Sequence, residues 1–224
     1  MEKRIIKGAR RQEKAEKPVK DKYDKQLLTI LVVIGIVFII IFSIWILVQK
    51  SKKFEYGGVN FEKIIYGKLP LYYSPIDITR SDGSKVRYNL YLRNDPRANN
   101  IPIDADINFK LGKIYVTSDE GVGKCEDTTL ALVNLGSFLS GMGFQPKGAS
   151  SNEQIAEQYN APYVTCWNNI GITILSLETA EDEMKISQDK GNPNCYILRV
   201  KDCNMINITE KFITETIKQK FVKT

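Results

Sequence analysis

The sequence predicts an α+β fold, in which an N-terminal transmembrane helix precedes an extracytoplasmic domain with a mostly antiparallel sheet and helices packed on one face. Three observations predict this fold class. One uncharged apolar run lies near the N-terminus, strand-like alternation dominates the segment after it, and helical periodicity appears mainly in the second half. Runs of strands followed by helices are typical of α+β domains.

The apolar run, Leu27–Val48, has no charged residue in 22 positions. At 1.5 Å per residue a helix of this length spans about 33 Å, enough to cross a hydrocarbon core about 30 Å thick. A core helix of a soluble protein would carry a polar stripe. A cleaved signal peptide would have a shorter apolar region followed by small residues, whereas Gln49 and Lys50 follow here. We therefore expect a signal anchor that is retained, with the lipid bilayer as its partner.

The charges that flank this run predict its orientation. Residues 1–25 carry ten Lys/Arg and five Asp/Glu, whereas the other flank offers Lys50, Lys52 and Lys53. Basic flanks stay in the cytoplasm, so we expect a single-pass protein of the cell membrane with its C-terminal domain outside the cytoplasm. The expected organisation is a basic cytoplasmic tail (1–25), a transmembrane helix (26–49), a linker (50–55) and an extracytoplasmic α+β domain (56–224).

The net charge of the whole chain does not indicate a nucleic-acid partner, because the basic residues are unevenly distributed. A net charge of +6 and a pI near 9.0 are typical of nucleic-acid-binding proteins. Residues 54–224, however, carry 19 basic and 21 acidic side chains. The basic tail is expected to set topology and to contact anionic lipid headgroups, and no nucleic-acid partner is expected.

Alternating side chains predict strands in the first half of the domain. Residues 85–93 alternate apolar and polar after a turn at 81–84. Shorter strands are expected at 69–73 and 113–117, with a further one within 54–65.

Helical spacing begins at residue 126. Helices are expected at 126–142, 152–159 and 208–222, and the last has Ile213, Ile217 and Phe221 on one face. Asn207 and Glu210 have the spacing of a capping box at its start. Between these helices, strands are expected at 171–178, 183–187 and 195–201.

The chain has four cysteines, and in an exported domain these predict two disulfides. If 195–201 is a strand, its ends lie roughly 20 Å apart, and a disulfide needs Cα atoms within about 7 Å. A Cys195–Cys203 bond is therefore disfavoured, and both cross-pairings with Cys125 and Cys166 stay open. Two alternatives are a zinc site of four cysteines and, if the topology is inverted, four free thiols.

The chain contains no histidine, which excludes Ser-His-Asp and Cys-His nucleophiles and the usual zinc spacings. The glycine loop at 117–125 resembles a phosphate-binding loop, but Ser118 and Cys125 replace its first glycine and its metal-binding hydroxyl. We therefore expect neither a cofactor nor a metal.

Carboxylates remain as candidates for acid–base chemistry, as in glycosidases. Their spacing does not distinguish them from surface charge, so we expect no enzyme and assign no catalytic residue. The candidates are Asp95, Asp104, Asp119, Glu120 and Asp127.

Two polar segments could recognise a ligand or carry a modification. Arg93 and Arg97 flank Asp95 in a predicted turn. They either pair with this carboxylate, which we expect first, or present a fork to an external anion. Asn207 begins the sequon Asn-Ile-Thr, so it is either glycosylated or caps the last helix.

The string 91–97, the basic tail, the apolar helix and the string 195–203 together resemble a group of uncharacterised archaeal single-pass membrane proteins. The resemblance covers most of residues 27–215. It implies an anchored domain and supplies no catalytic residue.

We therefore expect a membrane-anchored extracytoplasmic binding or assembly module of the cell envelope, with an envelope protein or glycan as partner. Two alternatives stay open. The expected β-α-α-β-β order of 113–187 is similar to polypeptide-transport-associated domains of division and secretion proteins. A carboxylate-dependent hydrolase of envelope polymers is the other.

Overall fold

The computed structural model describes residues 20–79, 83–109 and 112–222, so most of the predicted tail and the first half of the turn at 81–84 lie outside the described residues. The chain divides into two compact units, residues 1–49 and 50–224. Helix α1 (Lys20–Ser51) forms the described part of the first unit and ends two residues beyond it. Its segment Gln26–Leu47, with a mean hydropathy of 3.3, is long and apolar enough to span a membrane, the one such helix in the described part of the chain.

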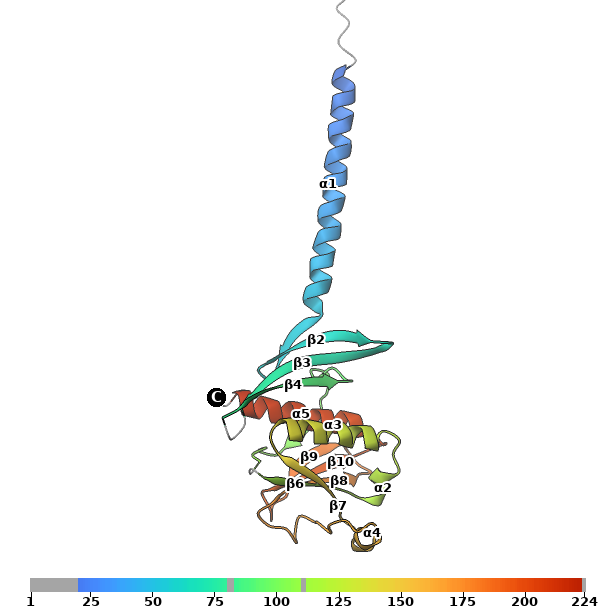
Figure 1. Cartoon of the computed structure of the whole chain (residues 1–224). Helices are drawn as coiled ribbons and strands as arrows, with labels where there is room; N and C mark the ends of the chain where they lie inside the picture. The colour runs from blue at the N-terminus through green and yellow to red at the C-terminus, as the bar shows by residue number, and fades with distance from the viewer. Residues whose placement is uncertain (1–19, 80–82, 110–111, 223–224) are drawn as a thin grey trace, which may run out of the picture. The chain divides into compact units, whose positions relative to one another are not determined.

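The second unit has three layers, with two long helices between two sheets (Figure 1). One sheet is antiparallel, has four strands and comes from the first half of the unit. The other has six strands and comes from residues 103–200. The elements of the helical layer are α3 (Thr128–Gly141) and α5 (Met205–Val222), and the two short helices are α2 (Glu120–Gly123) and α4 (Glu153–Gln158).

The four-stranded sheet consists of consecutive hairpins in the order β1-β2-β3-β4. Gly57 and Gly58, with φ of 60° and 78°, join the first pair through a turn of the type that needs two positive φ angles. Gly67, with φ of 63°, joins the second pair and is the glycine that a type II′ turn needs at its first central position. The strands are β1 (Lys53–Tyr56), β2 (Val59–Tyr66), β3 (Leu69–Thr79) and β4 (Lys85–Leu92). The first of them begins within the predicted linker 50–55.

The six-stranded sheet differs from the predicted one. Its order is β5-β9-β10-β8-β6-β7, and every neighbouring pair except β9–β10 is parallel. The expectation of a mostly antiparallel sheet is therefore confirmed for the first sheet and wrong for the second. The strands are β5 (Ile103–Asp104), β6 (Lys113–Ser118), β7 (Gln145–Ser150), β8 (Thr173–Thr179), β9 (Lys185–Gln188) and β10 (Cys195–Val200).

Strand β7 was not predicted, and it changes the order of elements. It lies between α3 and α4, so the segment 113–188 runs β-α-α-β-α-β-β and not β-α-α-β-β. The similarity to polypeptide-transport-associated domains rested on the shorter order. That argument for an assembly role therefore loses its basis.

Helix α5 is buried on nearly all sides, because it faces α3 beside it and a sheet on each side. Its apolar residues supply much of the core, among them Phe212 at 0% exposure. Buried threonines bond to carbonyls of their own helix: the Thr209 hydroxyl donates to Met205 O at 2.9 Å and that of Thr216 to Phe212 O at 2.7 Å. Such bonds satisfy a hydroxyl inside a core. The helix thus has more than the single apolar face that the sequence predicted.

Two disulfides connect segments of the second unit between residues 125 and 203. Cys125 bonds to Cys203 and Cys166 bonds to Cys195, so the pairings are cross-pairings and Cys195–Cys203 is not formed. The first bond lies near the surface, where Cys203 is exposed. The second lies within a small apolar cluster, with Cys195 at 0% and Cys166 at 7% exposure.

This difference in burial predicts an order of reduction. In folded full-length protein, a mild reductant should open Cys125–Cys203 first, because thiol–disulfide exchange needs access to a sulfur atom. Cys166–Cys195 should resist until the domain unfolds. Timed alkylation followed by peptide mass measurement checks this. Alkylation of Cys166 and Cys195 before the other pair would contradict the burial of the second bond.

Candidate binding site at the start of the last helix

The loop after β4 is fastened to α5 by one buried carboxylate. Glu210 is 5% exposed and accepts hydrogen bonds from the backbone N–H of Arg93 and Asn94 and from the Asn94 amide, the last at 2.9 Å. It therefore does not cap its own helix, because α5 begins five residues earlier at Met205. The predicted capping box of Asn207 and Glu210 is wrong.

Burial is the main influence on this carboxyl. Loss of solvation raises the pKa of Glu210 above its ordinary value of 4.5, although the hydrogen bonds from Arg93 and Asn94 oppose the rise. Burial thus disfavours the ionised form of Glu210. The hydrogen bonds from the two backbone N–H groups and from the Asn94 amide partly offset this cost.

The next turn of the loop closes on Asp95. Its carboxylate accepts from the Arg97 backbone N–H at 3.0 Å and from the Arg97 guanidinium at 3.0 and 2.7 Å. These bonds to Arg97 hold the pKa of Asp95 below its ordinary value. The guanidinium carbon also lies 3.7 Å from the centre of the Phe54 ring, a cation–π contact with β1.

Arg93 and Arg97 do not converge on a common point. The Arg93 guanidinium lies 4.0 Å from the Asp127 carboxylate, and that of Arg97 is engaged by Asp95. Each arginine therefore has a carboxylate of the chain as its partner, which supports a structural role for both. The alternative fork for an external anion is not formed in this arrangement.

A polar pocket lies between this loop, the residue before β9 and the start of α5. Its volume is about 340 Å³, and side-chain amides dominate its lining. The amides of Asn100, Asn204 and Asn207 have no hydrogen-bond partner within the described part of the chain. They present donors and acceptors together, which suits a neutral ligand with hydroxyl or amide groups. The lining residues are Asn94, Asp95, Ala98, Asn99, Asn100, Ile101, Met184, Asn204 and Asn207.

Asn207 belongs to this pocket and to the glycosylation sequon. Its backbone carbonyl accepts from the Asn99 amide at 2.7 Å. The sequon's threonine, Thr209, is 1% exposed and bonds within the helix. The folded domain therefore does not present the sequon hydroxyl, and glycosylation of Asn207 stays a prediction that concerns the chain before it folds.

The usual ligand crevice of a parallel sheet is closed in this domain. Such a crevice lies at the carboxyl ends of the strands, where successive connections leave in opposite directions, here between β6 and β8. The Asp119 carboxylate fills it and accepts from Val122 N at 2.8 Å, Thr179 N at 2.6 Å and Thr179 Oγ1 at 2.9 Å. Even a methyl group on Gly121 would clash with the Thr179 hydroxyl oxygen. The chain's own groups thus stand where an anionic ligand would bind.

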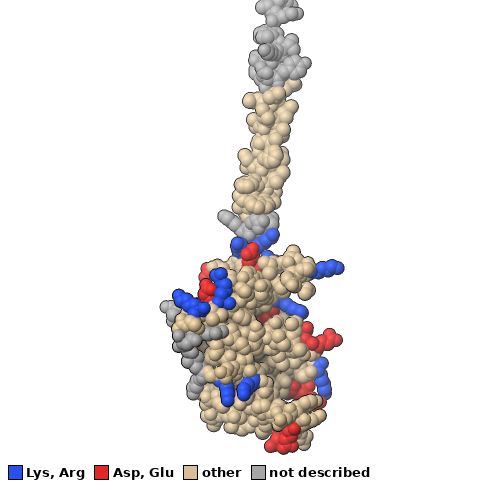
Figure 2. Space-filling model, viewed as in Figure 1, with Lys and Arg blue, Asp and Glu red and all other residues tan. Residues whose placement is uncertain are grey.

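The other predicted carboxylates are dispersed over the surface. Asp104 pairs with Lys185 at 3.4 Å, and Glu120 pairs with Lys124 at 2.8 Å. Among the described residues, no three His, Cys, Asp or Glu side chains converge in a way that could hold a metal ion. On the face drawn in Figure 2, basic and acidic side chains of the second unit are intermixed and no large patch of one sign forms.

Comparison of this chain with protein-family models, curated proteins and solved structures returned no significant match.

Sequence reasoning singled out Asp95 and Asn207 but not the pocket that joins them. Glu210 was noted as a helix cap, whereas its partners lie 116 and 117 residues earlier. The signal that could have found the pocket is the density of asparagines in 94–100 and 204–207.

We predict that Glu210→Gln destabilises the domain. An amide has one acceptor oxygen in place of two and turns a donor toward the N–H groups of residues 93 and 94, a loss of about 1–3 kcal/mol. The melting temperature of the full-length protein in detergent should fall by roughly 2–10 °C. Glu120→Gln, which removes a fully exposed ion pair, is the control and should leave the melting temperature unchanged. Equal effects of the two variants would contradict the role of Glu210.

The raised pKa also predicts a dependence of stability on pH. Because the folded-state pKa of Glu210 lies above 4.5, its contribution is most favourable below that value. It is lost as pH rises through the folded-state pKa. Thermal melts from pH 4 upward should show this step in the parent protein, and Glu210→Gln should lack it. An unchanged profile in the variant would assign the step to another group.

Proposed function

We propose that this protein is a membrane-anchored extracytoplasmic module that binds a neutral glycan of the cell envelope in the pocket at the start of α5. The observation that carries the proposal is the pocket's amide lining. Amide groups hydrogen-bond sugar hydroxyls as donors and as acceptors, whereas a site for a charged ligand would offer an unpaired opposite charge. The pocket's one carboxylate, Asp95, is already neutralised by Arg97.

Two independent features support a location of the domain outside the cytoplasm. Gln26–Leu47 is apolar enough to anchor the chain, and two disulfides are typical of a compartment outside the cytoplasm. The excess of basic residues before the helix supports an inward N-terminus. The proposed location is the cell membrane, with residues 56–224 outside.

A hydrolase at this pocket is less well supported. Glycoside hydrolysis needs two carboxyl groups on opposite sides of the bond, one of which must be protonated. The pocket lining contains Asp95 alone, and its contact with Arg97 lowers its pKa, which is the wrong direction for a general acid.

Protease protection tests the orientation. Protease added to intact cells should remove the C-terminal domain and leave an epitope placed at residue 1 protected. The same epitope should become accessible only after the membrane is permeabilised. Loss of the N-terminal epitope with retention of the domain would reverse the proposed topology.

Pocket variants test the ligand. Neutral oligosaccharides released from the host envelope should bind the full-length protein in lipid nanodiscs. Asn100→Ala and Asn204→Ala should each weaken binding about tenfold, as expected for loss of one to two hydrogen bonds. Asn60→Ala, an exposed asparagine of β2, is the matched control. Undiminished binding in both pocket variants would place the ligand elsewhere, and absence of binding by the parent protein would refute the glycan proposal.

A further inference from the structure

The hairpin of β2 and β3 ends in large apolar side chains that contribute nothing to the core. Ile65 is 76% exposed, Tyr66 75% and Leu69 54%. Cross-strand pairing sets Ile65 opposite Pro70 on one face of the hairpin and Tyr66 opposite Leu69 on the other, so both faces are apolar at this end of the sheet. A soluble domain normally avoids such a cluster, and where it occurs it marks a contact surface.

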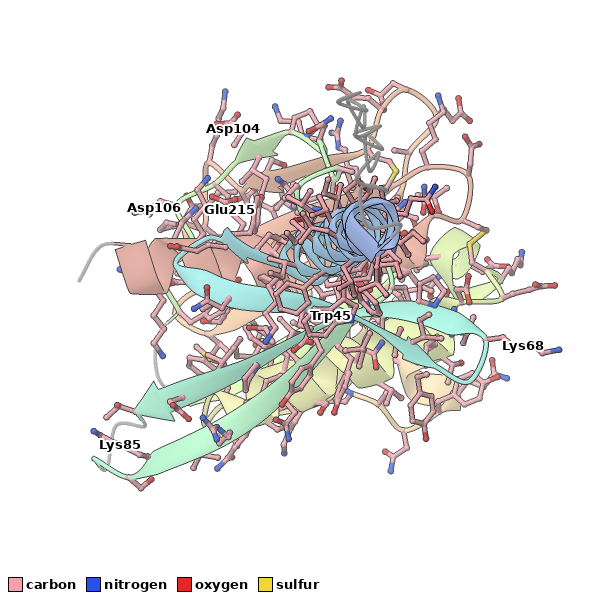
Figure 3. The ribbon with its side chains drawn as sticks, turned by 90° about the horizontal axis from the view of Figure 1, so that it is seen from above. Trp45, Lys68, Lys85, Asp104, Asp106 and Glu215 are labelled. Carbon is pink, nitrogen blue, oxygen red and sulfur yellow. A yellow bond between two sulfur atoms is a disulfide. The ribbon has the colours of Figure 1, made fainter. Side chains whose placement is uncertain are left out.

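This end of the hairpin is short and well defined. Its two-residue turn, Gly67-Lys68, directly follows paired residues, and the pairing continues without interruption to Glu62 and Tyr73. Figure 3 shows Lys68 at the outer end of the hairpin, pointing away from the rest of the domain. The tip thus presents apolar and aromatic groups beside one cation.

Chain connectivity sets an upper limit on the distance between this tip and the end of α1. Six Cα–Cα steps lead from Leu47 to Lys53, which is at most about 21 Å of chain. Lys53 pairs with Glu62, and from there four strand residues, about 13 Å, lead to Tyr66. Including the spacing between strands, the tip lies within roughly 40 Å of the last apolar residues of the helix.

A second pair of exposed apolar side chains is not restricted by the chain to the neighbourhood of α1. Trp167 and Ile170, at 73% and 76% exposure, lie in the loop held by the Cys166–Cys195 bond. They follow the helix by more than a hundred residues, and nothing around them identifies what would cover them.

We propose that the tip of the β2–β3 hairpin inserts into the headgroup region of the same bilayer that holds α1 and so fixes the domain at the membrane surface. The occupant of this surface is therefore lipid. Tyr66 has the amphipathic ring that favours the interface, Ile65 and Leu69 supply apolar area, and Lys68 faces anionic headgroups. The inference rests on the proposed membrane anchoring, and its test separates the two.

Short-range quenching by brominated acyl chains measures the insertion. The full-length protein carries Trp45 and Trp167, so the probe Tyr66→Trp is made with both replaced by Phe. The matched control is Tyr159→Trp in the same background, because Tyr159 is 72% exposed and lies at the end of α4. A third protein, Trp167→Phe alone, retains Trp45 within α1 and reports the anchor itself.

In nanodiscs that hold one chain each, the Tyr66→Trp indole should be quenched and its emission shifted to shorter wavelength, whereas the Tyr159→Trp indole should be neither. Lys68→Gln should lower the ratio of inserted to free hairpin about fivefold in discs with anionic lipid and have little effect in neutral discs. Ile65→Ser combined with Leu69→Ser should abolish the quenching.

Each contrary result has one reading. Quenching of Trp45 without quenching of the Tyr66→Trp indole overturns the hairpin proposal and leaves the anchor intact. Absence of quenching at Trp45 overturns the anchor and the hairpin proposal together. Equal quenching of the Tyr66→Trp and Tyr159→Trp indoles overturns a specific role for the tip.

Discussion

The structure depends on the burial of α5 between two sheets. Among the described residues of the second unit, α3 is the other long helix, and it lies beside α5 in the same layer. The apolar residues of α5 therefore serve both sheets at once, and its buried threonines are compatible with this position because their hydroxyls bond within the helix. Glu210 adds hydrogen bonds from α5 to the loop after β4. The position of α5 therefore also determines the position of this loop, whose residues form much of the pocket lining.

The elements with a strong local pattern could be predicted from the sequence. The alternation of β4 and the helical spacing of α3 both survive in the structure within a few residues, because each element buries one face and leaves the other more exposed. Strand β7 could not be predicted in this way. It contains Pro146 and Gly148, which suit an edge strand but lower its strand propensity, and it shows little alternation of burial. Missing it also hid the parallel pairing, which local periodicity does not report.

The candidate site was predictable only in fragments, because its contacts are long-range. Asp95 and Arg97 are two residues apart, and their pairing followed from sequence spacing. The bond between Asn94 and Glu210 depends on how α5 packs, which no short window contains. The same holds for Asp119, whose spacing resembled surface charge while two of its three hydrogen bonds come from Thr179 on β8. In this domain the crevice that a parallel sheet usually offers is filled, and the accessible pocket is built by connecting segments.

The two disulfides are nested, since Cys125 pairs with Cys203 and encloses Cys166–Cys195. In the topology proposed above, translocation delivers Cys125 and Cys166 to the outside before the other two cysteines, and these two are not partners. Oxidation during translocation would join them wrongly, whereas correct pairing must wait until Cys195 and Cys203 have arrived. In that topology, maturation of this protein needs either delayed oxidation or an enzyme that exchanges disulfides. Its yield in a foreign host should then depend on the isomerase activity of that host's export compartment more than on its oxidising strength.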